Sequence, residues 1–193
     1  DAAAAMVSSH ASLNVSVRLG ALEDVGRSEG EDLGLRVFVG RRNASVATSD
    51  FAAAALDELV ARAIRMAKEA PEDKWAGLAP EDRLLHGSPP LLDLDDGGVI
   101  APEDLRERAL EAEDAARAVE GVTNSEGAGA GASRAVMAFA TSHGFTGAYA
   151  ATSYGVQASV LAGQAGGMER DYAHHSARHL AHLEGAAAIG RRA

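Results

Sequence analysis

The chain has 193 residues, and its 18 Lys and Arg against 28 Asp and Glu give a formal net charge of −10 at pH 7. This charge disfavours nonspecific binding to DNA or RNA, because phosphate backbones repel it, and the short pairs Arg41–Arg42 and Arg191–Arg192 make no basic patch. The absence of cysteine excludes disulfides, thiol catalysis and thiolate metal sites. No apolar run approaches the ~20 residues of a membrane span, and the start of the chain lacks the pattern of a signal peptide.

The first part of the chain predicts an antiparallel meander. Apolar and polar side chains alternate in ASLNVSVRLG, which is typical of a strand with one wet face. Four short strands are expected, at 11–20, 21–30, 32–40 and 43–49. Glycines mark the expected turns between them: Gly20, Gly30 and Gly40.

The hydrophobic period then changes to that of a helix, which we predict over 51–69 with Ser49 and Asp50 as its N-cap. The expected apolar stripe consists of Leu56, Leu59, Val60, Ala63, Ile64 and Ala67. All five prolines lie between Pro71 and Pro102, so 71–101 is predicted to be an irregular, exposed connection with Trp75 packed on the surface as an anchor.

Pro102 is expected at the first position of a second helix, over 102–119, followed by Glu103 and Asp104 at the positive end of its dipole. Its expected apolar stripe is Leu105, Ala109, Ala112, Ala116 and Val119. Further strands are predicted at 121–127, 133–142, 145–162 and 167–174, and a closing helix at 186–193. Together these elements predict an α+β fold with a mostly antiparallel sheet, two long helices packed on one side and two strand-rich halves joined by the Pro-rich connection.

We predict a single domain over 1–193. It comprises strands and a helix (1–70), the connection (71–101), and a helix and strands (102–193). The chain lacks an initiator methionine and ends in the first turns of a helix. We therefore expect it to be part of a longer protein.

The segment 171-DYAHHSARHLAHLEG-185 holds His174, His175, His179 and His182. If 174–183 is helical, three of these histidines share one face at i, i+4 and i+7, a spacing that a zinc site permits. However, the H-E-x-x-H pattern of a catalytic zinc helix is absent, so we favour a structural role without bound metal. Such histidines are expected to titrate near the free value of ~6.5, so that acid loosens 171–185 before the sheet.

Two other patterns are weak candidates for chemistry. The run 127-GAGAGA-132 lacks the G-x-G-x-x-G and G-K-[ST] signatures of phosphate loops, which favours a flexible or tightly apposed strand segment. The acidic residues near the second predicted strand could work in acid–base catalysis, but cross-strand ion pairs with Arg18 and Arg27 are the favoured reading. This acidic group is Glu23, Asp24, Glu29, Glu31 and Asp32.

Several phrases resemble the TldD/PmbA family, specifically the N-terminal domain of its PmbA (TldE) branch. They occur in the family's order over nearly the whole chain: 16-SVRLGALEDVGRSEGEDLGLRVFVGRRNASVATSD-50, 122-VTNSEGA-128, 140-ATSHGFTGAY-149, 163-GQAGGMERDY-172 and 176-SARHL-180. The resemblance implies a cytoplasmic protein with a short helix before Asp1 and a larger part after Ala193. In the family pattern His179 is expected, whereas the other three histidines are local additions.

The resemblance also implies a link to metal-dependent peptidase activity, in which PmbA-like and TldD-like subunits form a heterodimer that processes or degrades small or unfolded peptides. Zinc is implied only for the TldD-like partner, whose H-E-x-x-x-H-type motif has no match here, because the sequence contains no His-Glu pair. No catalytic, cofactor-binding or metal residue is therefore expected in this chain, and neither nucleic acid nor membrane is an expected partner.

Three functions remain open from the sequence. The leading one is a subunit, noncatalytic or only jointly catalytic, of a peptidase complex, paired with a TldD-like subunit or a second copy of itself. The second is a regulatory protein-binding module acting on a DNA-related enzyme, since modulator of DNA gyrase is an older family name. The third is an independent metalloenzyme using the histidine cluster.

Overall fold

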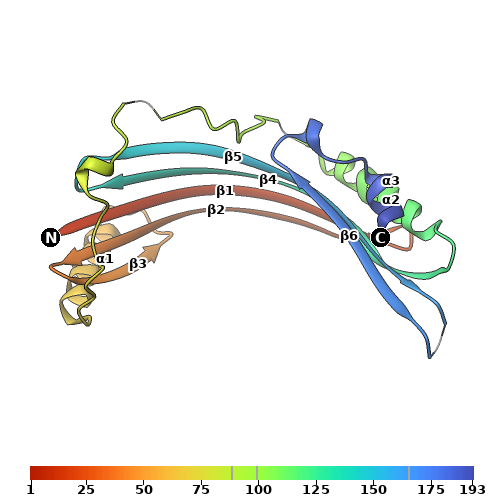
Figure 1. Cartoon of the computed structure of the whole chain (residues 1–193), viewed down its shortest axis with the longest axis horizontal. Coiled ribbons are helices and arrows are strands. Elements are labelled where there is room, and N and C mark those ends of the chain that lie inside the picture. Colours follow the sequence, from red (N-terminus) through yellow and green to blue (C-terminus); the bar gives the residue numbers. More distant parts are fainter. Residues whose placement is uncertain (88, 99, 165) are drawn as a thin grey trace. The chain divides into compact units, whose positions relative to one another are not determined.

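The computed structural model describes residues 1–87, 89–98, 100–164 and 166–193. Its elements are β1 (Ala2–Arg18), β2 (Ala21–Val39), β3 (Arg42–Thr48), α1 (Ala53–Glu69), η1 (Glu81–Arg83), α2 (Pro102–Arg117), β4 (Val122–Thr141), β5 (Thr146–Ala162), β6 (Glu169–Ala177), η2 (Leu180–His182) and α3 (Ala186–Arg192). The six strands form one sheet in the order β3-β2-β1-β4-β5-β6 (Figure 1). The predicted α+β class with a mostly antiparallel sheet is confirmed. Within the described ranges, no helix is both long and apolar enough to cross a membrane.

The strands are longer than the sequence predicted. β1 already begins at Ala2, β2 runs unbroken through Gly30, and β4 runs through the GAGAGA segment. The turn predicted at Gly30 is wrong, because this glycine makes room for a neighbouring side chain: a Cβ atom there would lie 2.8 Å from Cε1 of His10. Gly20 and Gly40 do occupy turns, with φ of 78° and 58°.

The contacts divide the chain into two compact units, each described by itself. The first comprises Asp1–His10, Gly30–Leu92 and Ala135–Ala150. In it α1 packs on β3 (Figure 1), and Val37 of β2 is buried against Ala63 and Ala67 of α1. The predicted stripe is only half correct, because Val60 and Ile64 remain 45% and 36% exposed.

The predicted N-cap of the first helix is also wrong. Ala52 is the cap residue and α1 begins at Ala53. The Asp50 carboxylate instead accepts the Ala52 N–H at 2.9 Å, which stabilises the turn before the helix rather than its first turn.

The second unit comprises Ala11–Glu29, Asp93–Arg134 and Ala151–Ala193. One face of its sheet packs on α2 and α3, and the buried residues of this core are Val15, Val17, Leu105, Ala109, Ala112, Ala116, Ala128, Ala130, Val156, Ala158, Val160, Ala173, Ala186 and Ile189. Each large apolar side chain buried here contributes about 1.5–3 kcal/mol. Pro102 opens α2 and the predicted stripe is buried as far as Ala116, whereas Val119 lies beyond the helix end and is 37% exposed.

The predicted irregular connection at 71–101 is confirmed for its described residues, where the 3₁₀ turn η1 is the one regular element. Trp75, however, is not packed on the surface: it is 82% exposed, and Lys74 Nζ lies 5.0 Å from the centre of its ring. The backbone near Trp75 is fixed by a hydrogen bond that the Asp73 N–H donates to the Arg41 carbonyl at 2.8 Å.

Candidate functional site

The GAGAGA segment gives the second unit a sheet with two different faces. Ala128 and Ala130, each 5% exposed, face the core with α2 and α3. Gly129 and Gly131 alternate with them and so lie on the opposite face. A Cβ atom at Gly131 would lie 2.3 Å from Oδ1 of Asn14, so glycine is needed for the Asn14 side chain to cross the strand. The prediction of a tightly apposed strand segment is confirmed.

A groove of about 530 Å³ lies over these glycines, and we call it the glycine-floored groove. Its lining is Asn14, Val15, Ser16, Asp24, Gly129, Ala130, Gly131, Ala132, Ser133, Ser153, Gly155, Val156, Gln157, His174, His175 and Ser176. Six of these residues carry a side-chain amide or hydroxyl, and such groups both donate and accept hydrogen bonds. Such a surface suits the neutral polar groups of an extended peptide.

A second hollow of about 330 Å³ adjoins this groove and shares Ser16, Gly129 and Gln157 with it. Glu23 and Glu126 are its acidic residues, and Glu126 accepts a hydrogen bond from Ser159 at 2.7 Å and pairs with Arg170 at 2.9 Å. The two hollows form one continuous surface on strands β1, β2, β4, β5 and β6.

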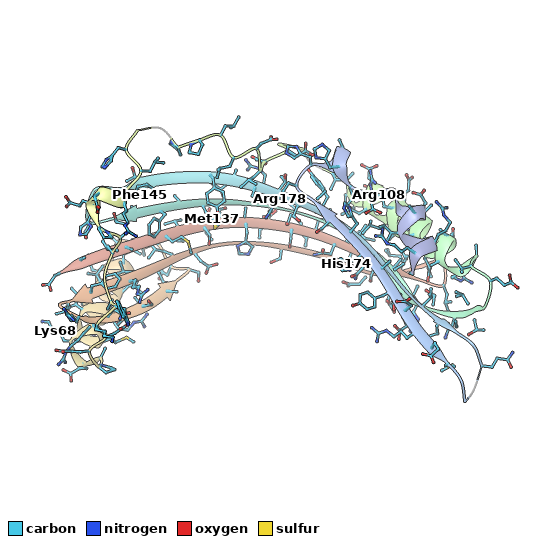
Figure 2. The ribbon with its side chains drawn as sticks, in the orientation of Figure 1. Lys68, Arg108, Met137, Phe145, His174 and Arg178 are labelled. Atoms are coloured by element: carbon cyan, nitrogen blue, oxygen red, sulfur yellow. The ribbon has the colours of Figure 1, made fainter. Side chains whose placement is uncertain are left out.

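The segment 174–183 is not one helix, so His175, His179 and His182 do not share the helix face that their spacing would have allowed. His174 and His175 belong to β6, where they pair with Gln157 and Val156 of β5 and therefore point to opposite faces. The ring of His174 (Figure 2) stacks on that of Tyr172, with ring centres 6.3 Å apart. The Nδ1 atom of His175 accepts a hydrogen bond from the Glu184 N–H at 3.2 Å. His179 and His182 lie at η2, with their ring centres 5.4 Å apart.

These residues do not fit a zinc site. Zinc requires three or four ligands that converge on one point. No group of three or more His, Asp or Glu side chains in the described part of the chain has a metal-binding arrangement. The two ring nitrogens of His179 are instead directed at two aspartates. The prediction that the cluster binds no metal stays a prediction.

The end of the connection, which we call the strap (Asp93–Gly98), is bound to β5. The Thr152 N–H donates to the Leu94 carbonyl at 2.9 Å, and the Asp96 N–H donates to Oγ1 of Thr152 at 2.9 Å. The Tyr154 hydroxyl donates to the Gly98 carbonyl at 3.4 Å. β6 ends opposite Tyr154, so the strap occupies the part of the β5 edge that β6 leaves unpaired at Thr152.

His179 holds the strap from the other side. Its Nε2 lies 3.0 Å from the Asp93 carbonyl oxygen and 3.3 Å from the Asp93 carboxylate, and its Nδ1 lies 3.4 Å from the Asp96 carboxylate. The hydrogen bond to Asp93 raises the pKa of His179, and although desolvation opposes this, the charges of Asp93 and Asp96 add to the rise. The prediction of titration near the free value is therefore wrong for His179.

The strap carboxylates are stabilised in their charged form. The Leu180 N–H, which donates to Asp96 at 3.0 Å, is the main cause that lowers the pKa of Asp96. Arg134 binds Asp95 through two nitrogens, with its Nη2 at 2.6 Å from Oδ2, and this contact lowers the pKa of Asp95.

Sequence reasoning missed a buried carboxylate. Glu113 of α2 is fully buried and accepts hydrogen bonds from the Leu19 N–H at 2.7 Å, the Gly20 N–H at 2.8 Å and the Ser125 hydroxyl. Burial raises the pKa of Glu113, but these three donors and the nearby Arg117 outweigh it, so the pKa is lowered. The signal was present in the sequence, because position 113 follows Ala109 by four residues on the apolar stripe.

The predicted cross-strand ion pairs of the acidic group are wrong. Arg27 pairs with Glu29, two positions along the same strand. Arg18 donates to the Ser125 carbonyl at 3.3 Å instead of to a carboxylate. The acidic residues of this strand are exposed, which fits a solvated edge region rather than paired catalytic carboxylates.

Two family models match the chain. The model for PmbA/TldA metallopeptidase domain 1 matches residues 3–67, and the model for the PmbA/TldA metallopeptidase central domain matches residues 95–193. The chain belongs to the PmbA/TldD family. The unmatched stretch between the two regions falls within or beside the irregular connection, and the prediction of a single domain stays a prediction.

Curated relatives agree with this assignment. The Metalloprotease PmbA of Escherichia coli O157:H7 is 32% identical over 185 residues, which are 95% of this chain and 41% of that protein. A Metalloprotease PmbA homolog from Haemophilus influenzae is 31% identical over 92% of this chain and 40% of its own length. The chain thus spans about two fifths of the length of these relatives.

Solved structures show the same fold. A candidate modulator of DNA gyrase from Bacteroides thetaiotaomicron matches all of this chain and 44% of its own, with a TM-score of 0.88 and 23% identity. TldE from Thermococcus kodakarensis matches all of this chain and 43% of its own, with a TM-score of 0.79 and 18% identity. At these identities the likeness is evidence for the fold alone.

Proposed function

We propose that this chain is the N-terminal part of a PmbA-like subunit of a cytoplasmic metallopeptidase complex that processes or degrades small peptides. In this proposal the segment binds the partner or the peptide and does not carry the catalytic residues. The observation that supports it most is the similarity to Metalloprotease PmbA over 95% of the chain. The partner is a TldD-like subunit, which supplies the zinc, or a second copy of the same protein.

The glycine-floored groove supports a binding role. Its lining offers hydrogen-bonding groups at regular strand spacing, and the amide side chains of Asn14 and Gln157 lie over its floor glycines, where they can meet the polar groups of an extended chain. The ionisable residues that line it are Asp24 of β2 and the neighbours His174 and His175 of β6, whose side chains point to opposite faces of the sheet. This arrangement favours recognition rather than bond cleavage.

The test uses the full-length protein, mixed with a TldD-like partner and an unfolded peptide. Complex formation on a sizing column and cleavage that requires both subunits are the expected results. A matched pair of variants locates the role of the groove: Asn14→Ala lies in it, whereas Asp114→Ala lies exposed on α2. We expect the first to weaken peptide binding and the second to leave it unchanged. Failure of both complex formation and cleavage would refute the proposal.

A second candidate is regulation of a DNA-related enzyme. It is supported by the name of two proteins with this fold, candidate modulators of DNA gyrase from Bacteroides thetaiotaomicron and Thermotoga maritima. A DNA supercoiling assay with purified gyrase distinguishes the two functions, because only a gyrase modulator changes the rate when no peptide or TldD-like partner is present.

A further inference from the structure

We propose that the strap is a pH-dependent latch, closed when His179 is a doubly protonated imidazolium clamped between Asp93 and Asp96 and released when His179 loses a proton. The strap lies at the start of the second region that the family models match, where the irregular connection enters the second unit. Its release would change how the connection is held at this end, independently of the proposed peptidase role.

The geometry requires both ring protons. Nε2 faces two oxygen acceptors of Asp93 and Nδ1 faces the Asp96 carboxylate, so each nitrogen must donate for both contacts to be favourable. A neutral imidazole has one N–H, and its second nitrogen would then bring a lone pair against an aspartate oxygen. Deprotonation therefore removes one contact and makes the other side repulsive.

The neighbours of His179 come from four other elements. The strap contributes Asp93 and Asp96, and its third carboxylate, Asp95, is engaged by Arg134 of β4. The ring of His182 in η2 lies 5.4 Å away. From β5, the Tyr154 hydroxyl interacts with Asp96.

Arg178, which precedes His179 (Figure 2), is occupied elsewhere, since its guanidinium donates to the Thr152 carbonyl at 3.1 Å. Two carboxylates thus face His179 directly, and one guanidinium beside them is already bound to Asp95. The local balance of charge favours the imidazolium form.

The sign of the pH effect follows from the direction of each pKa. Because the pKa of His179 is raised in the folded protein, the latch is fully stabilised below the free value of about 6.5 and loses that stabilisation as pH rises through the folded value. The pKa of Asp96 is lowered, so its charge persists well into the acid range. The latch is therefore closed in mildly acidic solution and opens as pH rises through the folded pKa of His179, which lies above the free value.

Opening of the latch would expose to solvent the backbone amides that now form hydrogen bonds between the strap and β5. The Thr152 and Asp96 amides are both hydrogen-bonded across the strap contact described above, so their protection from exchange reports closure. The Thr152 hydroxyl also donates to the Arg178 carbonyl at 2.6 Å, which links β5 to the segment that carries His179.

The test is amide hydrogen exchange by NMR on the 193-residue chain and on the full-length protein, with the His179 ring titrated in parallel. After correction for intrinsic exchange, the Thr152 and Asp96 amides should exchange faster as pH rises, by at most about tenfold per pH unit. The midpoint of this change in exchange rate should coincide with the midpoint of the His179 ring titration. In His179→Gln these amides should exchange fast at every pH. His143→Gln, an exposed histidine in the first unit, should behave as wild type.

Asp93→Asn provides a second variant that keeps the histidine. This substitution should lower the pH at the midpoint of the His179 titration, and the pH at which the Thr152 amide begins to exchange faster should fall with it. Protection of Thr152 and Asp96 that does not change across the His179 titration would overturn the latch, and so would a wild-type pH dependence in His179→Gln. Neither result depends on peptidase activity, so this test is separate from that of the proposed function.

Discussion

Glu113→Ala removes the carboxylate that fixes the β1–β2 turn to α2. The lost partners are the Leu19 and Gly20 amides and the Ser125 hydroxyl. A hydrogen bond to a charged group contributes about 1.5–3 kcal/mol. Leu19 and Gly20 are exposed, so their amides can form hydrogen bonds with water. Ser125 is fully buried, so its hydroxyl proton would be left without an acceptor, at a cost in stability. We therefore expect a loss of about 2–3 kcal/mol rather than the sum of three bonds.

For a domain of this size, that loss corresponds to a fall in Tm of about 4–12 °C. The measurement is urea unfolding followed by circular dichroism, with Glu113→Gln as a variant of nearly equal volume that loses the charge. Glu111→Gln, an exposed glutamate on the same helix, is the matched control and should leave the midpoint unchanged.

The pH dependence provides an independent check. The pKa of Glu113 is lowered in the folded protein, so its stabilisation is complete above the free carboxyl value of about 4.3 and is lost as pH falls through the folded value. The difference in unfolding free energy between wild type and Glu113→Gln should thus shrink in acid. Equal midpoints for Glu113→Gln and Glu111→Gln at neutral pH would refute the reasoning.

Two further predictions concern packing and exposure. Gly190→Ala should destabilise the contact between α2 and α3 by about 1–3 kcal/mol or more, because its Cβ atom would lie 2.0 Å from the Ala112 carbonyl oxygen. Gly77→Ala, where a Cβ atom meets nothing within 4 Å, is the control in the same urea unfolding assay, and an unchanged Gly190→Ala midpoint would contradict the packing. Limited proteolysis followed by mass spectrometry should cut first within 71–92, which is irregular and mostly exposed, and first cuts inside β1 or β4 would contradict this expectation.

The features that the sequence predicts well are those with a local period. The stripe of α2 is readable because apolar residues recur every three to four positions and Pro102 fixes the start of the helix. The glycines of the long strands mislead for a physical reason. Glycine is a residue typical of turns, but Gly30 instead leaves room for the His10 ring within a strand. The glycines of β4 likewise leave room for the Asn14 and Gln157 side chains of neighbouring strands.

The features of the candidate sites that the sequence could not predict are all long-range. His179 meets Asp93 across 86 positions, and Glu113 meets Leu19 across 94. No local pattern indicates such contacts, and the spacing of the histidines suggested a helix where the pairing with β5 imposes a strand. The family resemblance, in contrast, depends on long phrases in order and is confirmed by both family models.

The most direct test of the binding role is site-specific photo-crosslinking in the full-length protein, mixed with its TldD-like partner and an unfolded peptide. A photoreactive amino acid replaces Gln157, an exposed residue of the glycine-floored groove, and in a separate sample it replaces the exposed Glu111 on α2. We predict a crosslink from position 157 to the peptide or the partner and little or none from position 111. Equal crosslinking from both positions, or none from position 157 while the complex cleaves peptide, would contradict the assignment of this surface.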